Sequence, residues 1–295
     1  GLSVVVIKHH AHRLGVEGER EHKDSERFFA CGADTVLVTP EQILVGWHPG
    51  QGQDLPELVS RLDAHYDVIV CEGFKSYRFA LKIWLQKFDG ESPPAGVPGV
   101  HRCLGRREDR VAIVEALVVR WLEVRLKSTP LLGGVLVAAK GQRTQQGSTG
   151  NSVRRRGLSE YVLRALRDRV SQVVLLGSRQ ARGREVNLPT LPPVQGLRSP
   201  LAQMAAAMRW RSDAAWIFVA QDHPAVSGTV LEWLCGLRRP GLWGILARRP
   251  RSQSLRPALA LLEPRARLLL ETASSLSRLA SDPRIVTEPL PDEAP

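Results

Sequence analysis

The stretch DVIVCEGFK, residues 67–75, decides the fold: an apolar, β-branched run ends in a glutamate followed by a glycine. A continuous apolar run of this kind predicts a strand buried in a parallel sheet. Two similar runs precede it, SVVVI at residues 3–7 and TVLVT at residues 35–39, and the segments 26–31 and 55–65 between the runs have helical spacing. Strands that alternate with helices predict a doubly wound, mostly parallel α/β domain.

The residues after these strands are the first candidates for a ligand site, because parallel sheets bind ligands at the carboxyl ends of their strands. The first strand is followed by KHHAH, residues 8–12, and the third by Glu72, Gly73 and Lys75. A carboxylate after an apolar strand suits a magnesium ion beside a phosphate, and a glycine lets a ligand approach the backbone closely. The histidines and Glu72 are equally compatible with a plain polar rim of the sheet.

A second alternation of strands and helices begins near residue 132 and predicts a second doubly wound α/β unit. Apolar runs predict strands at 132–139, 172–176, 214–220, 242–247 and 257–262, and helical spacing predicts helices at 158–168, 200–208, 226–237 and 265–273.

The segment between the two alternations sets the predicted boundaries. A Pro- and Gly-rich loop at 89–100 and an amphipathic helix at 108–126 lead into a linker at 127–130. We expect domains at 1–126 and 131–285, followed by a poorly ordered, acidic tail at 286–295.

Composition narrows the class of protein. The 295 residues carry a net charge of +11, which attracts nucleotides, phosphorylated cofactors or nucleic acid. The sequence shows no zinc-finger spacing and no RNA-recognition aromatic motif, so nucleic-acid binding would rest on charge alone. Without an apolar run of bilayer length or a signal peptide, we expect a cytoplasmic protein with no membrane partner. The widely spaced cysteines are interpreted as core thiols: Cys31, Cys71, Cys103 and Cys235.

The second alternation carries an outline of nucleotidyl transfer, which needs a phosphate-holding loop, a cation and a metal-binding carboxylate. The segment GVLVAAKGQRTQQGSTG, residues 134–150, contains the polar loop that follows the first strand. The segment WIFVAQDHP, residues 216–224, is an apolar strand that ends at Asp222. Asp222 is the candidate magnesium ligand, and a helix-capping or turn role before Pro224 is the alternative.

Three segments taken in order give a more specific indication. VVVIKHHAH (4–12), KDSERFFACGAD (23–34) and DVIVCEGFK (67–75) resemble the molybdopterin-guanine dinucleotide biosynthesis adapter family, MobB, over residues 1–125. The resemblance implies a P-loop NTPase-like fold that binds GTP, assists guanylylation of the cofactor and forms a homodimer through the first domain. It also implies a set of residues that line the nucleotide or cofactor: Lys8, His9, His12, Asp24, Ser25, Arg27, Glu72 and Lys75.

The phosphate loop of this family, of the type GxxxxGK[ST], lies before the strand with which the sequence begins. That loop supplies backbone N–H groups, a lysine for the phosphates and a hydroxyl for magnesium. Either an upstream segment supplies it or this half has lost tight phosphate binding. We favour the first explanation, in which the sequence is a fragment.

The second half resembles the molybdenum cofactor guanylyltransferase family, MobA, over residues 131–285. The family patterns LAGGxSxRMGxDK, GPLAG, CDxP and PLxALY are matched by LVAAKGQRTQQGST, SPLAQ, QDHP and PALALLEP. The resemblance implies a Rossmann-like nucleotidyltransferase in which Arg143 is the loop arginine and Asp222 the catalytic aspartate. Thr149 stands where the family has its catalytic lysine, and Lys140, in place of a glycine, is a candidate substitute.

The first half resembles MobB and the second half resembles MobA, which are partners in one pathway. The sequence therefore predicts a fused protein of molybdenum cofactor biosynthesis. It would join GMP from GTP to molybdopterin with Mg²⁺ and serve molybdoenzymes or their chaperones. The altered loop leaves a second interpretation open, a catalytically impaired adapter that binds nucleotide or cofactor in the same pathway. A nucleic-acid-binding protein, the third interpretation, rests only on charge and would require steeply salt-dependent binding.

Overall fold

The structure is a computed structural model that describes the following residues: 1–8, 31, 35–38, 43–46, 55–137, 160–177, 188–192, 199–221, 223, 226–248 and 259–291, with backbone alone for 35–38 and 43–46. Contacts between residues divide the chain into two compact units, Gly1–Arg110 and Val111–Pro295.

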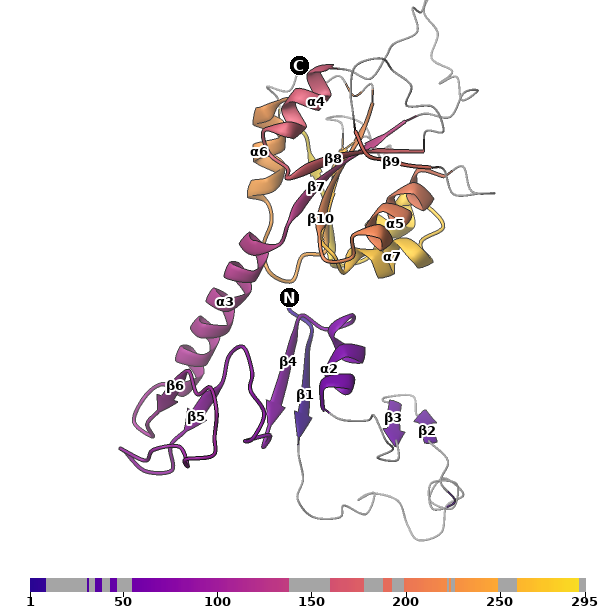
Figure 1. Cartoon of the computed structure of the whole chain (residues 1–295). Coiled ribbons are helices and arrows are strands. Elements are labelled where there is room, and N and C mark those ends of the chain that lie inside the picture. The colour runs from indigo at the N-terminus through magenta and orange to yellow at the C-terminus, as the bar shows by residue number, and fades with distance from the viewer. Residues whose placement is uncertain are drawn as a thin grey trace, which may run out of the picture. The chain divides into compact units, whose positions relative to one another are not determined.

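The first unit contains short paired strands (Figure 1). Strands β1 (Val4–Lys8) and β4 (Val68–Glu72) run parallel, with helix α2 (Leu55–Asp63) between them in sequence. Strands β2 (Thr35–Val38) and β3 (Ile43–Gly46) form an antiparallel pair, and β5 (Ile83–Leu85) and β6 (Arg102–Leu104) form a parallel pair.

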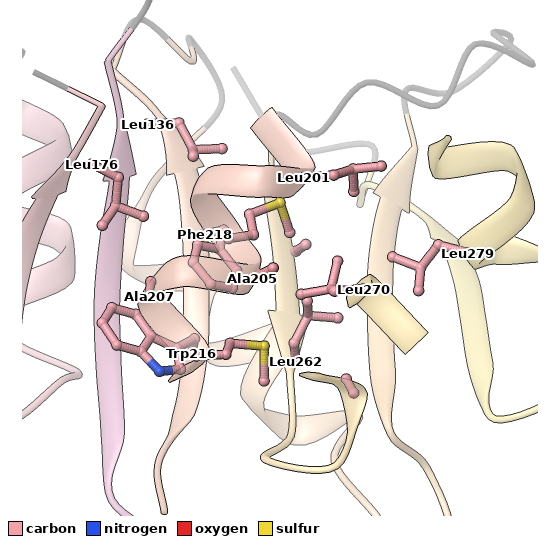
Figure 2. Packing of buried hydrophobic residues seen from close by; sticks show 14 of the residues in the cluster. Leu136, Leu176, Leu201, Ala205, Ala207, Trp216, Phe218, Leu262, Leu270 and Leu279 are labelled. Atoms are coloured by element: carbon pink, nitrogen blue, oxygen red, sulfur yellow. The ribbon is translucent and has the colours of Figure 1, made fainter. Parts of the chain in front are cut away.

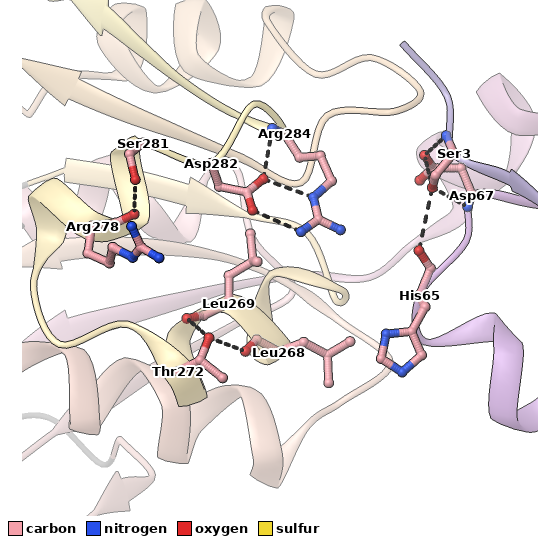
Figure 3. Close-up of polar contacts among 10 residues, drawn as sticks. All are labelled: Ser3, His65, Asp67, Leu268, Leu269, Thr272, Arg278, Ser281, Asp282 and Arg284. Carbon is pink, nitrogen blue, oxygen red and sulfur yellow. Dashed lines mark hydrogen bonds and ion pairs between the residues drawn. The ribbon is translucent and has the colours of Figure 1, made fainter. Parts of the chain in front are cut away.

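A buried carboxylate joins the starts of β1 and β4. Asp67 is 6% exposed, and its Oδ2 accepts hydrogen bonds from the Ser3 amide (2.8 Å) and the Ser3 hydroxyl (2.9 Å). The Asp67 amide donates in return to Ser3 Oγ at 3.0 Å, and Figure 3 shows the group. Because these bonds lie just before both strands, they hold the register in which Lys8 pairs with Glu72 at the far ends.

The second unit is built on a seven-stranded sheet with the order β13-β11-β12-β10-β7-β8-β9. Its strands are β7 (Leu131–Leu136), β8 (Gln172–Leu176), β9 (Thr190–Leu191), β10 (Ala215–Ala220), β11 (Gly244–Arg248), β12 (Leu259–Leu262) and β13 (Ile285–Pro289). Strand β12 runs antiparallel to both of its neighbours, and the other adjacent strands are parallel. The α/β class with a mostly parallel large sheet is therefore confirmed.

Helices cover both faces of this sheet. Helices α4 (Glu160–Arg167) and α6 (Gly228–Gly236) pack on one face, and α5 (Pro200–Trp210), α7 (Ala266–Thr272) and α8 (Leu276–Ala280) pack on the other. The result is a three-layer arrangement in which successive strand residues point to opposite cores. Of the described helices, none combines the length and the apolar character needed to cross a bilayer.

The core under α5 is tightly packed (Figure 2). Trp216 and Phe218 on β10 are fully buried and stack with ring centroids 5.6 Å apart. A Cβ at Gly134 on the adjacent β7 would lie 2.8 Å from Phe218 and 2.9 Å from Leu176. Glycine at this position therefore lets an aromatic ring lie flat against the strand.

Helix α3 (Arg110–Ser128) is tied to the second unit at its carboxyl end. The Arg238 guanidinium forms a double ion pair with Glu263, with nitrogen–oxygen distances of 2.6 and 3.0 Å, and also donates to the Leu126 carbonyl. Both charged side chains are largely buried, at 12% and 11% exposed. An arginine bound to an otherwise open carbonyl of the last turn stabilises that end of the helix.

Three sequence expectations need correction. Helix α3 extends through Ser128, so the predicted linker at 127–130 is shortened to Thr129 and Pro130 before β7 begins. Residues 285–289, assigned largely to a poorly ordered tail, form strand β13 and pair with β11 over five positions.

The predicted core thiols are also wrong. Cys31 and Cys103 are exposed, and Cys71 and Cys235 are only partly buried. Burial raises the pKa of the Cys71 and Cys235 thiols, which keeps these two groups protonated at neutral pH.

Candidate functional site

The first candidate site lies at the carboxyl ends of β1 and β4. Lys8 and Glu72 occupy paired positions on these strands, and Lys8 Nζ lies 3.5 Å from Glu72 Oε1. Their side chains are 62% and 60% exposed, and ion pairs this exposed contribute at most about 1 kcal/mol. A phosphate or a metal ion could therefore displace the pair at little energetic cost.

The chain turns sharply after Glu72. Gly73 has φ +88°, a conformation that strongly favours glycine, and the amide of Lys75 donates to the Gly73 carbonyl. The Lys75 ammonium then lies 5.7 Å from the centroid of the Trp84 ring. Lys75, two residues after the turn at Gly73, thus makes a cation–π contact with Trp84 of β5.

Lys82, which the sequence did not single out, fixes the segment after this turn. Its Nζ donates to the carbonyls of Lys75 and Tyr77 at 2.6 Å each and to that of Pro98 at 3.2 Å. Burial lowers the pKa of Lys82. No signal in the sequence marks Lys82, because its partners are backbone carbonyls brought together by the fold.

The second candidate site is the edge of the large sheet where β7, β8 and β10 end. Pairing continues just past these strands, since the Val137 amide donates to the Leu176 carbonyl and the Gln221 amide donates to the Leu136 carbonyl. Val137 and Gln221, the residues directly after β7 and β10, therefore lie side by side at this edge of the sheet. In parallel sheets this edge is where ligands bind.

Helix α5 begins near the same edge of this unit. Ser199 caps it, its Oγ accepting from the Leu201 amide at 3.2 Å, and Pro200 occupies the first turn. The SPLAQ segment is therefore the start of a helix. Its serine hydroxyl caps the helix, and its proline has no backbone N–H group that would need a hydrogen-bond acceptor.

Two buried polar residues line this edge. His223, one residue beyond Asp222, is 6% exposed, and its amide donates to the Ala220 carbonyl. Gln203 in the first turns of α5 is 9% exposed. A Cβ at Gly177, directly after β8, would lie 2.4–2.5 Å from the Gln203 amide group. His223 and Gln203 belong to the sequence segments QDHP and SPLAQ. Those patterns alone did not single out the two residues, and only their burial in the structure does.

Most of the predicted site residues lie outside the described residues. In the first half these are His9, His12, Asp24, Ser25 and Arg27, and in the second half Lys140, Arg143, Thr149 and Asp222. Of the predicted set, the structure therefore locates Lys8, Glu72 and Lys75, and it brings the first two together.

These features define the class of protein: an α/β protein with polar residues gathered at the carboxyl ends of parallel strands, the arrangement that binds nucleotides and phosphorylated ligands. Family comparison matches residues 133–288 to the MobA-like NTP transferase domain and residues 1–95 to molybdopterin guanine dinucleotide synthesis protein B, MobB. The chain belongs to the MobA-like NTP transferase family and carries a MobB domain in its first part.

Similar solved structures include molybdopterin-guanine biosynthesis protein B, which is 22% identical over 42% of this chain and 81% of that chain, with TM-score 0.30. Rv0371c from Mycobacterium tuberculosis H37Rv is 16% identical over 55% of this chain and 88% of its own, with TM-score 0.41. A 4-diphosphocytidyl-2C-methyl-D-erythritolsynthase from Anaerococcus prevotii DSM 20548 is 9% identical over 58% of this chain and 92% of its own, with TM-score 0.39. No curated protein matched the chain.

Together the two matched domains indicate a protein of molybdenum cofactor biosynthesis with a nucleotidyltransferase domain. The resemblance predicted from the sequence is confirmed in both halves.

Proposed function

We propose that this protein transfers GMP from GTP to molybdopterin. The observation that carries the proposal is the parallel pairing of β7 with β10, which ends at Leu136 opposite Ala220. The loop with Lys140 and Arg143 follows β7, and Asp222 follows β10. Phosphate-binding cations and a carboxylate would therefore start from neighbouring strand ends, as phosphoryl transfer requires.

In this reaction an oxygen of the molybdopterin phosphate attacks the α-phosphorus of GTP, and the bond to the β-phosphate oxygen breaks to release pyrophosphate. Arg143 and Lys140 would bind the phosphates and offset the charge on the leaving group. Carboxylate oxygens are ligands that Mg²⁺ prefers, so Asp222 fits a magnesium ion that neutralises the phosphates.

The first unit would deliver GTP or cofactor to this reaction. The support for this role is the exposed Lys8–Glu72 pair at adjacent strand ends, with Lys75 beyond the following turn. His9, His12, Asp24, Ser25 and Arg27 complete the proposed binding set. Glu72 is the second carboxylate at a strand end that could bind magnesium beside a phosphate.

A homodimer through the first unit is part of the proposal. Val4 and Val6 on β1 and Val70 on β4 are 51%, 60% and 44% exposed. The register places Val6 beside Val70, so the three side chains share one face of the strand pair. Exposed valines gathered on one face favour contact with a second copy of the chain.

Molybdoenzymes or their chaperones in the cytoplasm would receive the product.

A catalytically impaired adapter is the second candidate. It is favoured by Thr149 at the position of the family's catalytic lysine. Such a protein would bind GTP or molybdopterin without releasing pyrophosphate.

The test is pyrophosphate release by the purified chain with Mg²⁺, GTP and molybdopterin. We expect release that requires the cofactor and is abolished by Asp222→Ala, whereas Asp168→Ala, an exposed carboxylate of the same unit, retains it. Binding of GTP or molybdopterin without release would establish the adapter. Absence of both binding and release would refute both candidates.

A further inference from the structure

Two lysines of the first unit use their ammonium groups in different ways. Lys82 Nζ donates to the carbonyls of Lys75 and Tyr77 at 2.6 Å each and to the Pro98 carbonyl at 3.2 Å. An ammonium group has three N–H donors, so these three carbonyls occupy all of them. Lys82 therefore cannot donate to a ligand without giving up one of its contacts with the backbone.

Lys75 shows the opposite pattern. Its side chain is exposed, and among the described residues its ammonium group has neither a hydrogen bond nor an ion pair. The contact that the structure gives this group is with the Trp84 ring, whose centroid lies 5.7 Å from Lys75 Nζ. A cation–π contact uses the charge and leaves the N–H donors of Lys75 available to an anion.

The bonds from Lys82 hold the backbone that carries Lys75. Residues 73–77 belong to none of the described strands, and the Lys75 amide donates to the Gly73 carbonyl within the same turn. The carbonyls of this turn are tied to the residues that follow by the Lys82 ammonium group. Trp84 lies two residues beyond Lys82, so one short segment holds both the backbone and the side chain of Lys75.

A cation whose position is fixed before the ligand arrives binds more tightly, because less side-chain freedom is lost on binding. We propose that Lys82 is a positioning residue that holds Lys75 beyond the carboxyl end of β4 for contact with a phosphate group. Both GTP and molybdopterin carry such a group, and a lysine is a suitable partner for it. The inference rests on the proposed role of the first unit in binding GTP or the cofactor.

The test measures affinity at Lys75 itself, in the whole chain. Acetylation of Lys75 by an N-hydroxysuccinimide ester is followed by mass spectrometry while either GTP with Mg²⁺ or molybdopterin is added in increasing amounts. The concentration that protects half of Lys75 gives the affinity at this side chain, so binding in the second unit does not contribute.

Three variants are compared with the wild type. Lys82→Met removes the three hydrogen bonds, whereas Lys82→Arg keeps the charge and can still donate to the carbonyls. Lys87→Met is the matched control, because it removes the same charge from another exposed lysine of this unit. Hydrogen exchange of the paired amides of β1 and β4 reports whether each variant is folded.

We expect one of the two ligands to protect Lys75 in the wild type, and Lys82→Met to need roughly 10-fold more of it, since the Lys75 side chain must then be ordered on binding. Lys82→Arg should recover most of this affinity, and Lys87→Met should match the wild type. In Lys82→Met the amides of Lys75 and Tyr77 should exchange faster, while those of β1 and β4 stay protected.

Equal affinity at Lys75 in the wild type and Lys82→Met, or a loss in Lys82→Arg as large as in Lys82→Met, would overturn the inference and leave the proposed function intact. A wild-type Lys75 that neither ligand protects would overturn the inference together with the proposed role of the first unit. Pyrophosphate release tests the second unit separately.

Discussion

Among single residues, Arg284 makes side-chain contacts that a substitution can test. Its guanidinium donates to both oxygens of Asp282 at 2.8 Å (Figure 3). The guanidinium carbon also lies 3.8 Å from the centroid of the buried Trp243 ring. We expect Arg284→Ala to lower the free energy of unfolding of this unit by about 1–2 kcal/mol, since a two-point charged pair and a cation–π contact are lost together. Urea denaturation measures the effect.

Arg278→Ala is the matched control, because this arginine is exposed and, among the described residues, only its backbone takes part in the hydrogen bonds of α8. A change within about 0.5 kcal/mol is expected for it. Equal losses in the two variants would mean that the Arg284 contacts contribute no stability.

The ion pair between Arg284 and Asp282 also predicts that the stability of this unit depends on pH. The hydrogen bonds from Arg284 hold the pKa of Asp282 below its ordinary value of 3.8. A carboxyl group whose pKa is lower in the folded state stabilises the fold above its unfolded pKa, and this stability is lost as pH falls through the folded pKa. Wild type should therefore exceed Asp282→Asn in stability at pH 6, and the difference should shrink below about pH 4. A difference independent of pH would contradict the lowered pKa.

At the same scale, the sequence identified Lys8 and Glu72 because each ends an apolar strand, and parallel strands bring such ends together. It could not identify the burial of Gln203, which packs against Gly177 from a different part of the chain. Trp210, a large apolar residue, is 44% exposed because it occupies the last turn of α5. Helical spacing alone does not show where a helix leaves the sheet.

At the scale of secondary-structure elements, truncation of the chain before β13 tests how much this strand stabilises the second unit. Ile285 is 5% exposed and Leu290, just beyond the strand, is 6% exposed. A chain ending at Arg284 loses both side chains and the five pairs with β11. Burying an aliphatic side chain contributes roughly 1.5–3 kcal/mol, so this truncation should lower stability by several kcal/mol. A chain ending at Pro291 retains β13 and should melt within a few degrees of the full chain.

Equal melting temperatures for the two truncated chains would show that β13 does not stabilise the sheet. Differential scanning calorimetry gives this comparison directly.

The strands also show why some elements could be predicted from the sequence and others could not. Long apolar runs such as those of β7 and β10 were recognised, because central parallel strands are apolar on both faces. Strand β13 (IVTEP) lies at the edge of the sheet, where polar residues and a terminal proline are tolerated, and its composition therefore resembled a tail. Strands β5 and β6 have three residues each, too few to show a period.

For the whole molecule, the division into two compact units predicts two unfolding transitions. Trp216→Ala removes a fully buried ring from the second unit, a loss of about 3–5 kcal/mol. At about 2–4 °C for each kcal/mol in a domain of this size, one transition should fall by roughly 6–20 °C. Leu104→Ala, which empties a buried site in the first unit, should lower the other transition. A single transition that responds to both variants would mean that the units unfold as one.

The contact between Gly177 and Gln203 has a consequence for how this family can diversify. A side chain at residue 177 would occupy the space that the glutamine amide now fills, and glycine is also needed there for its positive φ. The two positions should therefore covary among homologues: glutamine at the second site should accompany glycine at the first, and a larger residue at the first should accompany a small one at the second. Diversification at this edge of the sheet would then require two coordinated changes, one on each side of the contact.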